Sequence, residues 1–249
     1  RPRFTAGEDW MTAFAGEVRD AYKGYLKELE RRHRAGGSGV ETARACCLGV
    51  ETVVRHLHDS LREWMGARCR RAPAVIGLGG VGRRDLSPKS DVDLLFLWDK
   101  KPGPAGTAFA GYLVRMLWDA GLELGSSVRT VAELRKALGR DTDLKTAVLD
   151  GRWICGEESM KDALPAIKDA GRSRESGELL EAKLEEARSR WKKFGWSYHL
   201  IEPNVKESPG GLRDHQMIRW IGMVLPWDGT LEGLYRLAII AHQEVKDIR

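Results

Sequence analysis

The sequence predicts an α+β fold in which two N-terminal helices precede a small mixed sheet and a mostly helical second half follows it. Helical spacing of apolar residues runs through the first 65 positions, β-like runs flank a glycine cluster between residues 74 and 98, and helical spacing returns after residue 131. A chain of 249 residues, 42% hydrophobic and 31% charged, can bury a core. We therefore expect N-terminal helices over residues 1–72, a core over 73–156 and a helical domain over 157–249.

The first two elements are expected to be long amphipathic helices. Apolar side chains recur at helical spacing from Asp9 to about Arg34, and a turn rich in glycine follows at residues 35–39. A second stripe of the same period runs over residues 40–65, and Gly66 is expected to cap it.

Three strands are expected next. A short β-like run over residues 74–78 enters the glycine cluster, and a longer one follows over residues 91–98. Residues 101–106 form a loop, and a helix built around Phe109 ends near Gly121. A third strand is expected over residues 122–128.

The second half is expected to be mainly helical. Thr130 and Glu133 have the spacing of a capping box for a helix over Val131–Leu138. Helical patterns continue through residues 144–155, 161–170 and 178–194, and they resume near His215 and Leu231 after a loop over residues 202–214 that contains proline and glycine.

The composition of the sequence bears on its location, its partners and the state of its cysteines. The sequence contains no run of about 18 apolar residues, so we expect no transmembrane helix, and no signal-peptide pattern, which favours a cytoplasmic location. The net charge of +5 allows a polyphosphate or nucleic-acid partner without requiring one. The four cysteines contain no C-x-x-C pair and are expected to be reduced thiols.

The glycine cluster over residues 77–82 contains the spacing G-x-G-x-x-G of dinucleotide-binding folds. In those folds a helix opens directly after the glycines and presents its N-terminus to a pyrophosphate. Here residues 83–90 show no apolar periodicity, include Pro88 and lead straight to another strand. We therefore do not expect a dinucleotide site.

Two carboxylates begin the strand that follows. Asp91 and Asp93 are two positions apart, and side chains two apart in an extended chain point to the same face. Their Cα atoms would be about 7 Å apart. Such neighbours repel each other unless a cation binds both, and Mg²⁺ is commonly held by carboxylates together with substrate phosphates. The alternative is structural, with Asp91 capping a turn and Asp93 a charge at the strand edge. Residues 79–94 taken together favour Asp91 and Asp93 as catalytic ligands of Mg²⁺ or Mn²⁺.

The residues before these carboxylates are candidates to bind nucleotide phosphates. Gly79 and Gly80 lack a Cβ and let backbone N–H groups approach a phosphate closely. Arg83 and Ser90 can add charge-assisted and hydroxyl contacts to a triphosphate.

Two groups of basic residues outside this segment have open interpretations. Lys206 and Arg213 are candidates to reach the triphosphate, unless their loop is only a rigid turn in which Arg213 pairs with Asp214. The basic residues at positions 62, 68, 70 and 71 form either a docking surface for acidic partners or, as charge runs usually do, a helix end that faces solvent.

The string over residues 79–94 resembles the signature of the polymerase-β-like nucleotidyltransferase superfamily, in the form carried by bacterial PII-uridylyltransferases. The segments 117–130, 143–156 and 202–214 resemble that family as well, although the last is shared with glutamine-synthetase adenylyltransferases. The resemblance implies a polymerase-β-like core and transfer of UMP from UTP to a tyrosine hydroxyl of a PII signal protein, in nitrogen regulation. It also implies metal binding by Asp91 and Asp93 and phosphate binding by Gly79 and Gly80.

The sequence departs from this family at several positions. Arg84 and Asp85 stand where glycine and glutamate are usual, and Ser126 stands where histidine is usual. Glu123 is the nearest candidate for a third carboxylate, although an ordinary surface charge is the simpler interpretation. Uridylyl removal is not predicted, because no set of residues with the pattern of a phosphohydrolase metal site is found.

Three alternative functions are protein AMP transfer like that of the adenylyltransferases, a catalytically inactive regulatory module, and RNA modification. RNA modification would require RNA binding that weakens strongly as the salt concentration rises. The expected partners are a nucleoside triphosphate, with UTP favoured, and a PII-type protein. No membrane or nucleic-acid partner is expected.

Overall fold

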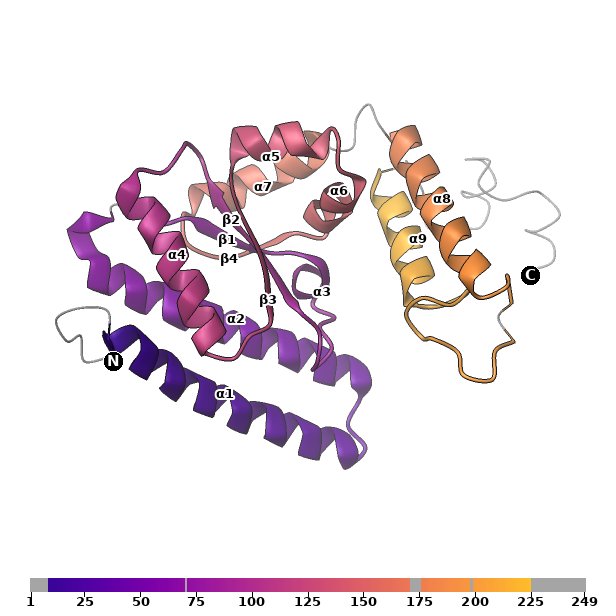
Figure 1. The fold of residues 1–249 in the computed structure, drawn as a ribbon, viewed down its shortest axis with the longest axis horizontal. Coiled ribbons are helices and arrows are strands. Elements are labelled where there is room, and N and C mark those ends of the chain that lie inside the picture. Colours follow the sequence, from indigo (N-terminus) through magenta and orange to yellow (C-terminus); the bar gives the residue numbers. More distant parts are fainter. Residues whose placement is uncertain (1–8, 70, 171–175, 198, 225–249) are drawn as a thin grey trace. The chain divides into compact units, whose positions relative to one another are not determined.

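The computed structural model describes residues 9–69, 71–170, 176–197 and 199–224 (Figure 1). The chain divides into two compact units, one made of residues 1–138 and 150–167 and the other of residues 139–149 and 168–249. Helices flank a four-stranded mixed sheet in the first unit, so the predicted α+β class is confirmed. The N-terminal helices, which the sequence-based division set apart from the core, belong to the same unit as the sheet.

The two N-terminal helices form where predicted. Helix α1 spans Asp9–Arg34 and α2 spans Gly39–Met65. The Ser38 side chain accepts a hydrogen bond from the Glu41 N–H and caps the start of α2. Gly66 has a positive φ and ends this helix, and a short 3-10 helix, η1, follows over Gly66–Arg68.

The sheet has the strand order β3-β2-β1-β4. Its strands are β1 (Ala74–Gly77), β2 (Val92–Trp98), β3 (Leu124–Thr130) and β4 (Arg152–Cys155). Strand β1 is antiparallel to both of its neighbours, whereas β2 and β3 are parallel. A parallel pair needs a crossover, which α4 (Pro104–Asp119) supplies.

One hydrophobic cluster joins the sheet to helices α1, α2 and α4, which pack against one another and are drawn as ribbons in Figure 1. Its fully buried members include Leu57 from α2, Phe96 from β2 and Phe109 from α4. Strand β1 is buried along its whole length, as expected of a central strand between two neighbours. The cluster therefore fixes the ends of β1 and β2, where the candidate site lies.

The structure corrects the expected helix over residues 144–155. Helix α6 covers Thr142–Leu149, but residues 152–155 form strand β4, in which Trp153 pairs with Ile76 of β1. A short apolar run has no clear period, so pairing with an open sheet edge decides its structure. Helix α4 likewise begins at Pro104, inside the expected loop, because proline suits the first position of a helix.

The predicted capping box is confirmed. Helix α5 spans Val131–Leu138, the Glu133 carboxylate accepts from the Thr130 N–H at 2.8 Å, and the Glu133 N–H donates to the Thr130 hydroxyl at 3.2 Å. Helix α7 spans Ser159–Ala170. Its residues up to 167 belong to the first unit, and its last three residues belong to the second.

The second unit contains α6, α8 (Ser176–Lys193) and α9 (Leu212–Val224). Leu149, Leu179 and Trp220 form a small buried cluster that joins these three helices. Helix α9 begins at Leu212, three residues before the expected start near His215, and the helix expected near Leu231 lies outside the described residues.

The cysteines are buried and unpaired, which confirms the expectation of reduced thiols; they are Cys46, Cys47, Cys69 and Cys155. Among the helices that the structure describes, none combines the length and the apolar character that crossing a membrane would require.

Candidate active site

The glycine cluster connects strand β1 to a very short helix. Helix α3 covers Gly79–Arg83, and Arg84 ends it in the left-handed conformation, with φ 62° and ψ 37°. Residues 84–91 contain no helix, as predicted, but the glycines themselves form a helical turn that the sequence analysis did not foresee. The Gly82 N–H donates to the Leu78 carbonyl at 3.0 Å and closes this turn.

Two glycines of the cluster are required by close packing. A Cβ on Gly77 would lie 2.5 Å from Cγ1 of Val81, and a Cβ on Gly82 would overlap the Asp150 carbonyl oxygen. These glycines let the α3 turn lie directly against the end of β1 and the start of β4. Gly80 is less constrained, since a Cβ there would lie 3.3 Å from Cδ1 of Leu86.

Asp91 immediately precedes strand β2, and Asp93 is the second residue of that strand. Both are exposed, whereas Val92 between them is buried, which is the alternation expected of an extended chain. The Leu78 N–H donates to the Asp93 carbonyl at 2.9 Å and ties the glycine cluster to this strand. The structure thus brings the predicted phosphate-binding segment and the predicted metal ligands together.

The Asp93 carboxylate lies between two glycines. A Cβ on Gly79 would be 3.3 Å from its Oδ2, and a Cβ on Gly125 would overlap its Oδ1. Gly125 is the register partner of Asp93 on the parallel strand β3. No role was predicted for Gly125, although a glycine inside a strand is itself a signal of close approach.

Glu123 precedes strand β3 beside the two aspartates. Its carbonyl accepts from the Val92 N–H at 2.7 Å and its side chain is exposed. Within the described ranges, no group of three or more His, Cys, Asp or Glu side chains is arranged to hold a metal ion. Two adjacent carboxylates nevertheless fit the oxygen donors that Mg²⁺ prefers, with its other positions left to water and phosphate. The absence of a Cβ on Gly79 and Gly125 leaves space around one of them.

Arg83 is held by two carboxylates of its own unit. Its Nε donates to Asp85 at 2.8 Å and its Nη1 donates to Asp150 at 2.7 Å, and its side chain is only 9% exposed. Burial alone would lower the pKa of the Arg83 guanidinium, but these two hydrogen bonds raise it above its ordinary value. Arg83 therefore stays charged and anchors α3 to the residue before β4. Ser90 is exposed in the turn before Asp91, and its N–H donates to the Ser87 carbonyl.

A second ion pair, between Arg152 and Glu51, supports the α3 turn through the backbone carbonyls of that turn. The Arg152 guanidinium donates to the Val81 carbonyl at 2.8 Å and the Gly82 carbonyl at 3.3 Å, and it pairs with the buried Glu51. The Cys47 thiol also donates to the Val81 carbonyl, at 3.3 Å. Burial, and next the Glu51 charge, raise the pKa of Cys47 to about 12. This network was missed by the sequence analysis because it joins positions about a hundred residues apart.

The chain is similar to known uridylyltransferases. The family model of GlnD PII-uridylyltransferase matches residues 178–249. A bifunctional uridylyltransferase/uridylyl-removing enzyme from Azospirillum brasilense is 33% identical over 224 residues, which are 88% of this chain and 24% of that protein. One from Burkholderia vietnamiensis is 35% identical over 188 residues, 76% of this chain and 22% of that protein.

Over most of its own length the chain is similar to these uridylyltransferases. It spans about a quarter of the length of these curated relatives. The region matched by the family model overlaps α8 and α9, so the relationship is carried by the second unit as well as by the sheet.

Two residues depart from the pattern of the family that the sequence resembles, and the structure describes both; they are Arg84 and Ser126. Arg84, where the family usually has glycine, adopts a positive φ, a conformation that L-residues adopt at a cost of about 1 kcal/mol. Its Nε lies 3.9 Å from Glu51. Ser126, where the family usually has histidine, is exposed on β3 opposite Leu94.

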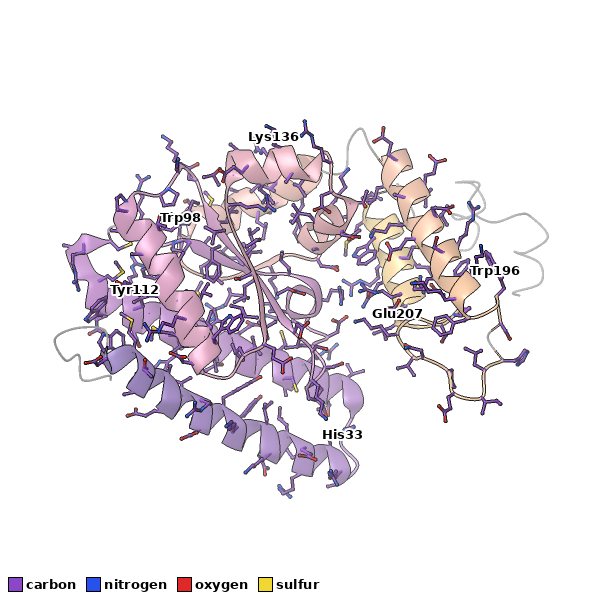
Figure 2. All side chains as sticks on the ribbon, in the orientation of Figure 1. His33, Trp98, Tyr112, Lys136, Trp196 and Glu207 are labelled. Carbon is purple, nitrogen blue, oxygen red and sulfur yellow. The ribbon has the colours of Figure 1, made fainter. Side chains whose placement is uncertain are left out.

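Lys206 and Arg213 lie in the second unit, whereas Asp91 and Asp93 lie in the first. Arg213 lies 3.5 Å from the carboxylate of Glu207, labelled in Figure 2, and its N–H donates to the Lys206 carbonyl. The alternative pairing of Arg213 with Asp214 is wrong.

Asp214 instead holds the loop to helix α8. It accepts from Arg190 at 2.7 Å, from the Trp191 indole at 3.0 Å and from the Gly210 N–H at 2.7 Å. These bonds fix the loop over residues 202–214 on its own unit, where it presents Lys206 with its side chain exposed.

Proposed function

We propose that this chain transfers UMP from UTP to a hydroxyl group of a PII-type signal protein, as a part of nitrogen regulation. The observation that supports the proposal is the exposure of Asp91 and Asp93 on either side of the buried Val92, with the Asp93 carboxylate between Gly79 and Gly125. The names of the relatives, which include uridylyltransferase activity, favour a uridylyl group over other nucleotidyl groups.

In this proposal Asp91 and Asp93 hold Mg²⁺ or Mn²⁺. When bound, the metal neutralises phosphate charge and favours loss of the proton from the attacking hydroxyl. The first N–H groups of α3, at Gly79 and Gly80, have no partner inside that helix and are available to phosphate oxygens. Gly125 keeps the Asp93 carboxylate in place by leaving room for it.

The reaction is a substitution at the α-phosphorus of UTP. The acceptor oxygen forms a bond to this phosphorus, the bond to the bridging oxygen of the β-phosphate breaks, and pyrophosphate leaves. Positioning and charge neutralisation supply most of the catalysis in such transfers. Ser90, exposed beside Asp91, and the basic residues Lys206 and Arg213 are proposed to contact the triphosphate. Arg83 is proposed to act on the nucleotide mainly by holding α3.

The test is transfer of label from α-³²P-UTP to purified PII protein in the presence of Mg²⁺. We expect transfer by the wild-type chain and a loss of at least about a hundredfold in Asp93→Asn, since a metal ligand is removed while the shape is kept. The matched control is Asp162→Asn, an exposed carboxylate on α7 of the same unit, which should retain full transfer. Undiminished transfer by Asp93→Asn would refute the proposal, and preference for ATP would favour AMP transfer instead.

A catalytically inactive regulatory module is the second candidate. Arg83 donates its hydrogen bonds to Asp85 and Asp150 rather than offering them to a nucleotide, which favours the inactive module. Ser126, at a position where the resemblance leads us to expect histidine, favours it as well. Calorimetry with UTP separates the two candidates. Binding that depends on Mg²⁺ and is lost in Asp93→Asn supports the enzyme, whereas Mg²⁺-independent binding or no binding supports the inactive module.

A further inference from the structure

Strand β3 lies at one edge of the sheet, where it pairs with a single neighbour, β2. The pairing is parallel and in unbroken register over all seven residues of β3. The Val92 N–H donates to the Glu123 carbonyl at 2.7 Å, which fixes the alternation of this ladder. Both backbone groups of a residue point to the same side in a parallel ladder. The odd-numbered residues of β3 therefore bond β2, and the even-numbered ones direct their backbone groups to the open edge.

The groups directed outward are the N–H and C=O of Leu124, Ser126 and Val128. Among the residues that the structure describes, no backbone hydrogen bond joins these groups to another segment. The Thr130 N–H, at the end of the strand, is already bonded by the Glu133 carboxylate. Ser126 is exposed and Val128 is 50% exposed, so the edge groups between them lie at the surface. A partner can reach them.

The opposite edge of the sheet is protected in ways that β3 is not. Strand β4 has only four residues, and its register with β1 is irregular. Two cations, Arg55 and Lys161, lie over the ring of Trp153 on this strand. Short length, irregular register and nearby charges discourage pairing with a further strand. Strand β3 has seven residues, a regular register, no proline and one charged side chain, Arg129.

The open edge is one strand away from the Asp93 carboxylate. A Cβ on Gly125 would overlap Oδ1 of Asp93, so this carboxylate lies over β3, on the face to which a side chain at Gly125 would point. Ser127 shares that face, because side chains alternate along a strand. Both residues are small and leave the way from the edge to the carboxylate open. Neighbouring strands are about 4.8 Å apart, so a strand added at the edge would lie about 10 Å from β2, within reach of a long side chain.

We propose that the open edge of β3 binds an extended segment of the acceptor protein as an added strand. The proposal rests on the proposed function, for which it supplies the docking site of the polypeptide substrate. Main-chain groups at strand spacing are matched by another extended main chain, which pairs with Ser126 and Val128. Side chains of the added strand alternate between the two faces. An apolar one covers Val128, and on the other face the acceptor hydroxyl lies over Gly125, next to the Asp93 carboxylate.

Amide hydrogen exchange, followed by NMR in the ¹⁵N-labelled chain, tests for an added strand. It is measured with and without purified PII protein, in the absence of nucleotide and metal. In the free chain we expect fast exchange at Ser126 and Val128 and slow exchange at Ser127, whose N–H bonds β2. Binding of PII should slow the first two amides at least about tenfold. Asp93→Asn should show the same protection, so that docking is measured apart from transfer.

Variants of the strand show whether its backbone makes the contact. Ser126→Pro removes an outward N–H and no bond to β2, and proline is tolerated at such a position of an edge strand. Its affinity for PII, measured by calorimetry, should fall at least about tenfold, whereas Ser126→Ala keeps the N–H and should bind as the wild type does.

A charge placed on the edge gives a second comparison. Val128→Lys should weaken PII binding, because a lysine on an edge strand opposes the approach of another strand. The matched control is Leu48→Lys, which places the same charge at an apolar residue of α2 that is 61% exposed. This control should leave the affinity unchanged. Circular dichroism should show a folded chain in all of these variants.

The proposal is overturned if the wild-type chain does not bind PII, or if binding leaves exchange at Ser126 and Val128 unchanged. Equal affinity of Ser126→Pro and Ser126→Ala would also overturn it. A dimer of the wild-type chain that Ser126→Pro dissociates would assign the edge to a second copy of this chain instead. Protection of the edge by PII without transfer of label would support this docking site and refute the proposed function.

Discussion

At the residue scale, the candidate site depends on how the Asp93 carboxylate is placed. Gly79 comes from the glycine cluster and Gly125 from strand β3, and the two approach the carboxylate from different elements. Nothing in the local sequence relates Gly125 to Asp93. Their relationship follows from the parallel register of β2 and β3, which requires the whole crossover through α4 to be in place.

The variant Gly125→Ala tests this placement. The added Cβ would overlap Oδ1 of Asp93, so the carboxylate must move, and we expect uridylyl transfer to fall at least about tenfold. The control is Gly111→Ala on α4, where a Cβ would meet nothing within 4 Å and alanine favours the helix by about 1 kcal/mol. Equal transfer by both variants would show that the space beside Asp93 is not needed.

The buried Glu51 gives a prediction for the pH dependence of stability. Burial opposes ionisation of Glu51, but the hydrogen bond and charge of Arg152 lower its pKa below the ordinary value of 4.5. Because the pKa is lower in the folded chain than in the unfolded chain, the carboxylate stabilises the fold fully above about pH 4.5. This contribution is lost as the pH falls through the folded-state pKa.

Urea unfolding measured between neutral and acidic pH tests this prediction. The free energy of unfolding of Glu51→Gln should be lower than that of the wild type at pH 7, and it should decline less steeply at acidic pH. The exposed Glu63→Gln on the same helix serves as the control and should follow the wild-type profile. Identical acid slopes for Glu51→Gln and wild type would contradict the assignment.

At the scale of elements, the sequence predicted the helices whose positions are decided by residues close together in the chain. The stripes of α1 and α2 and the capping box of α5 are set by residues three and four apart, and the structure has these elements within a residue or two of the expected bounds. Strand β4 was missed because residues 152–155 become a strand only by pairing with β1, which lies about 75 residues earlier. The α3 turn was missed because glycines have no periodicity to reveal it.

The capping box of α5 provides a test at this scale. Thr130 is buried and its hydroxyl accepts from the Glu133 N–H, so Thr130→Ala should lower the free energy of unfolding by about 1 kcal/mol. Thr52→Ala is the control, because that exposed threonine lies inside α2 and bonds only the carbonyl one turn earlier. A loss in Thr52→Ala as large as in Thr130→Ala would remove the special role of the cap.

At the scale of the whole molecule, the chain crosses between its two compact units more than once. Residues 139–149 belong to the second unit, and residues 150–167 return to the first. Helix α6 is held there by its neighbours, as shown by Asp143, which accepts from the buried Lys183 of α8. A division of the sequence into consecutive segments could not predict this arrangement, because tertiary contacts rather than composition decide it.

The central claim is that Asp91 and Asp93 together bind a divalent ion with a nucleotide. Electron paramagnetic resonance of free Mn²⁺, titrated into the chain at a fixed UTP concentration, measures this binding directly. We predict one Mn²⁺ bound by the wild-type chain beyond that held by UTP alone, and affinity at least about tenfold weaker in Asp91→Asn/Asp93→Asn. Unchanged Mn²⁺ binding in the double variant would contradict the account.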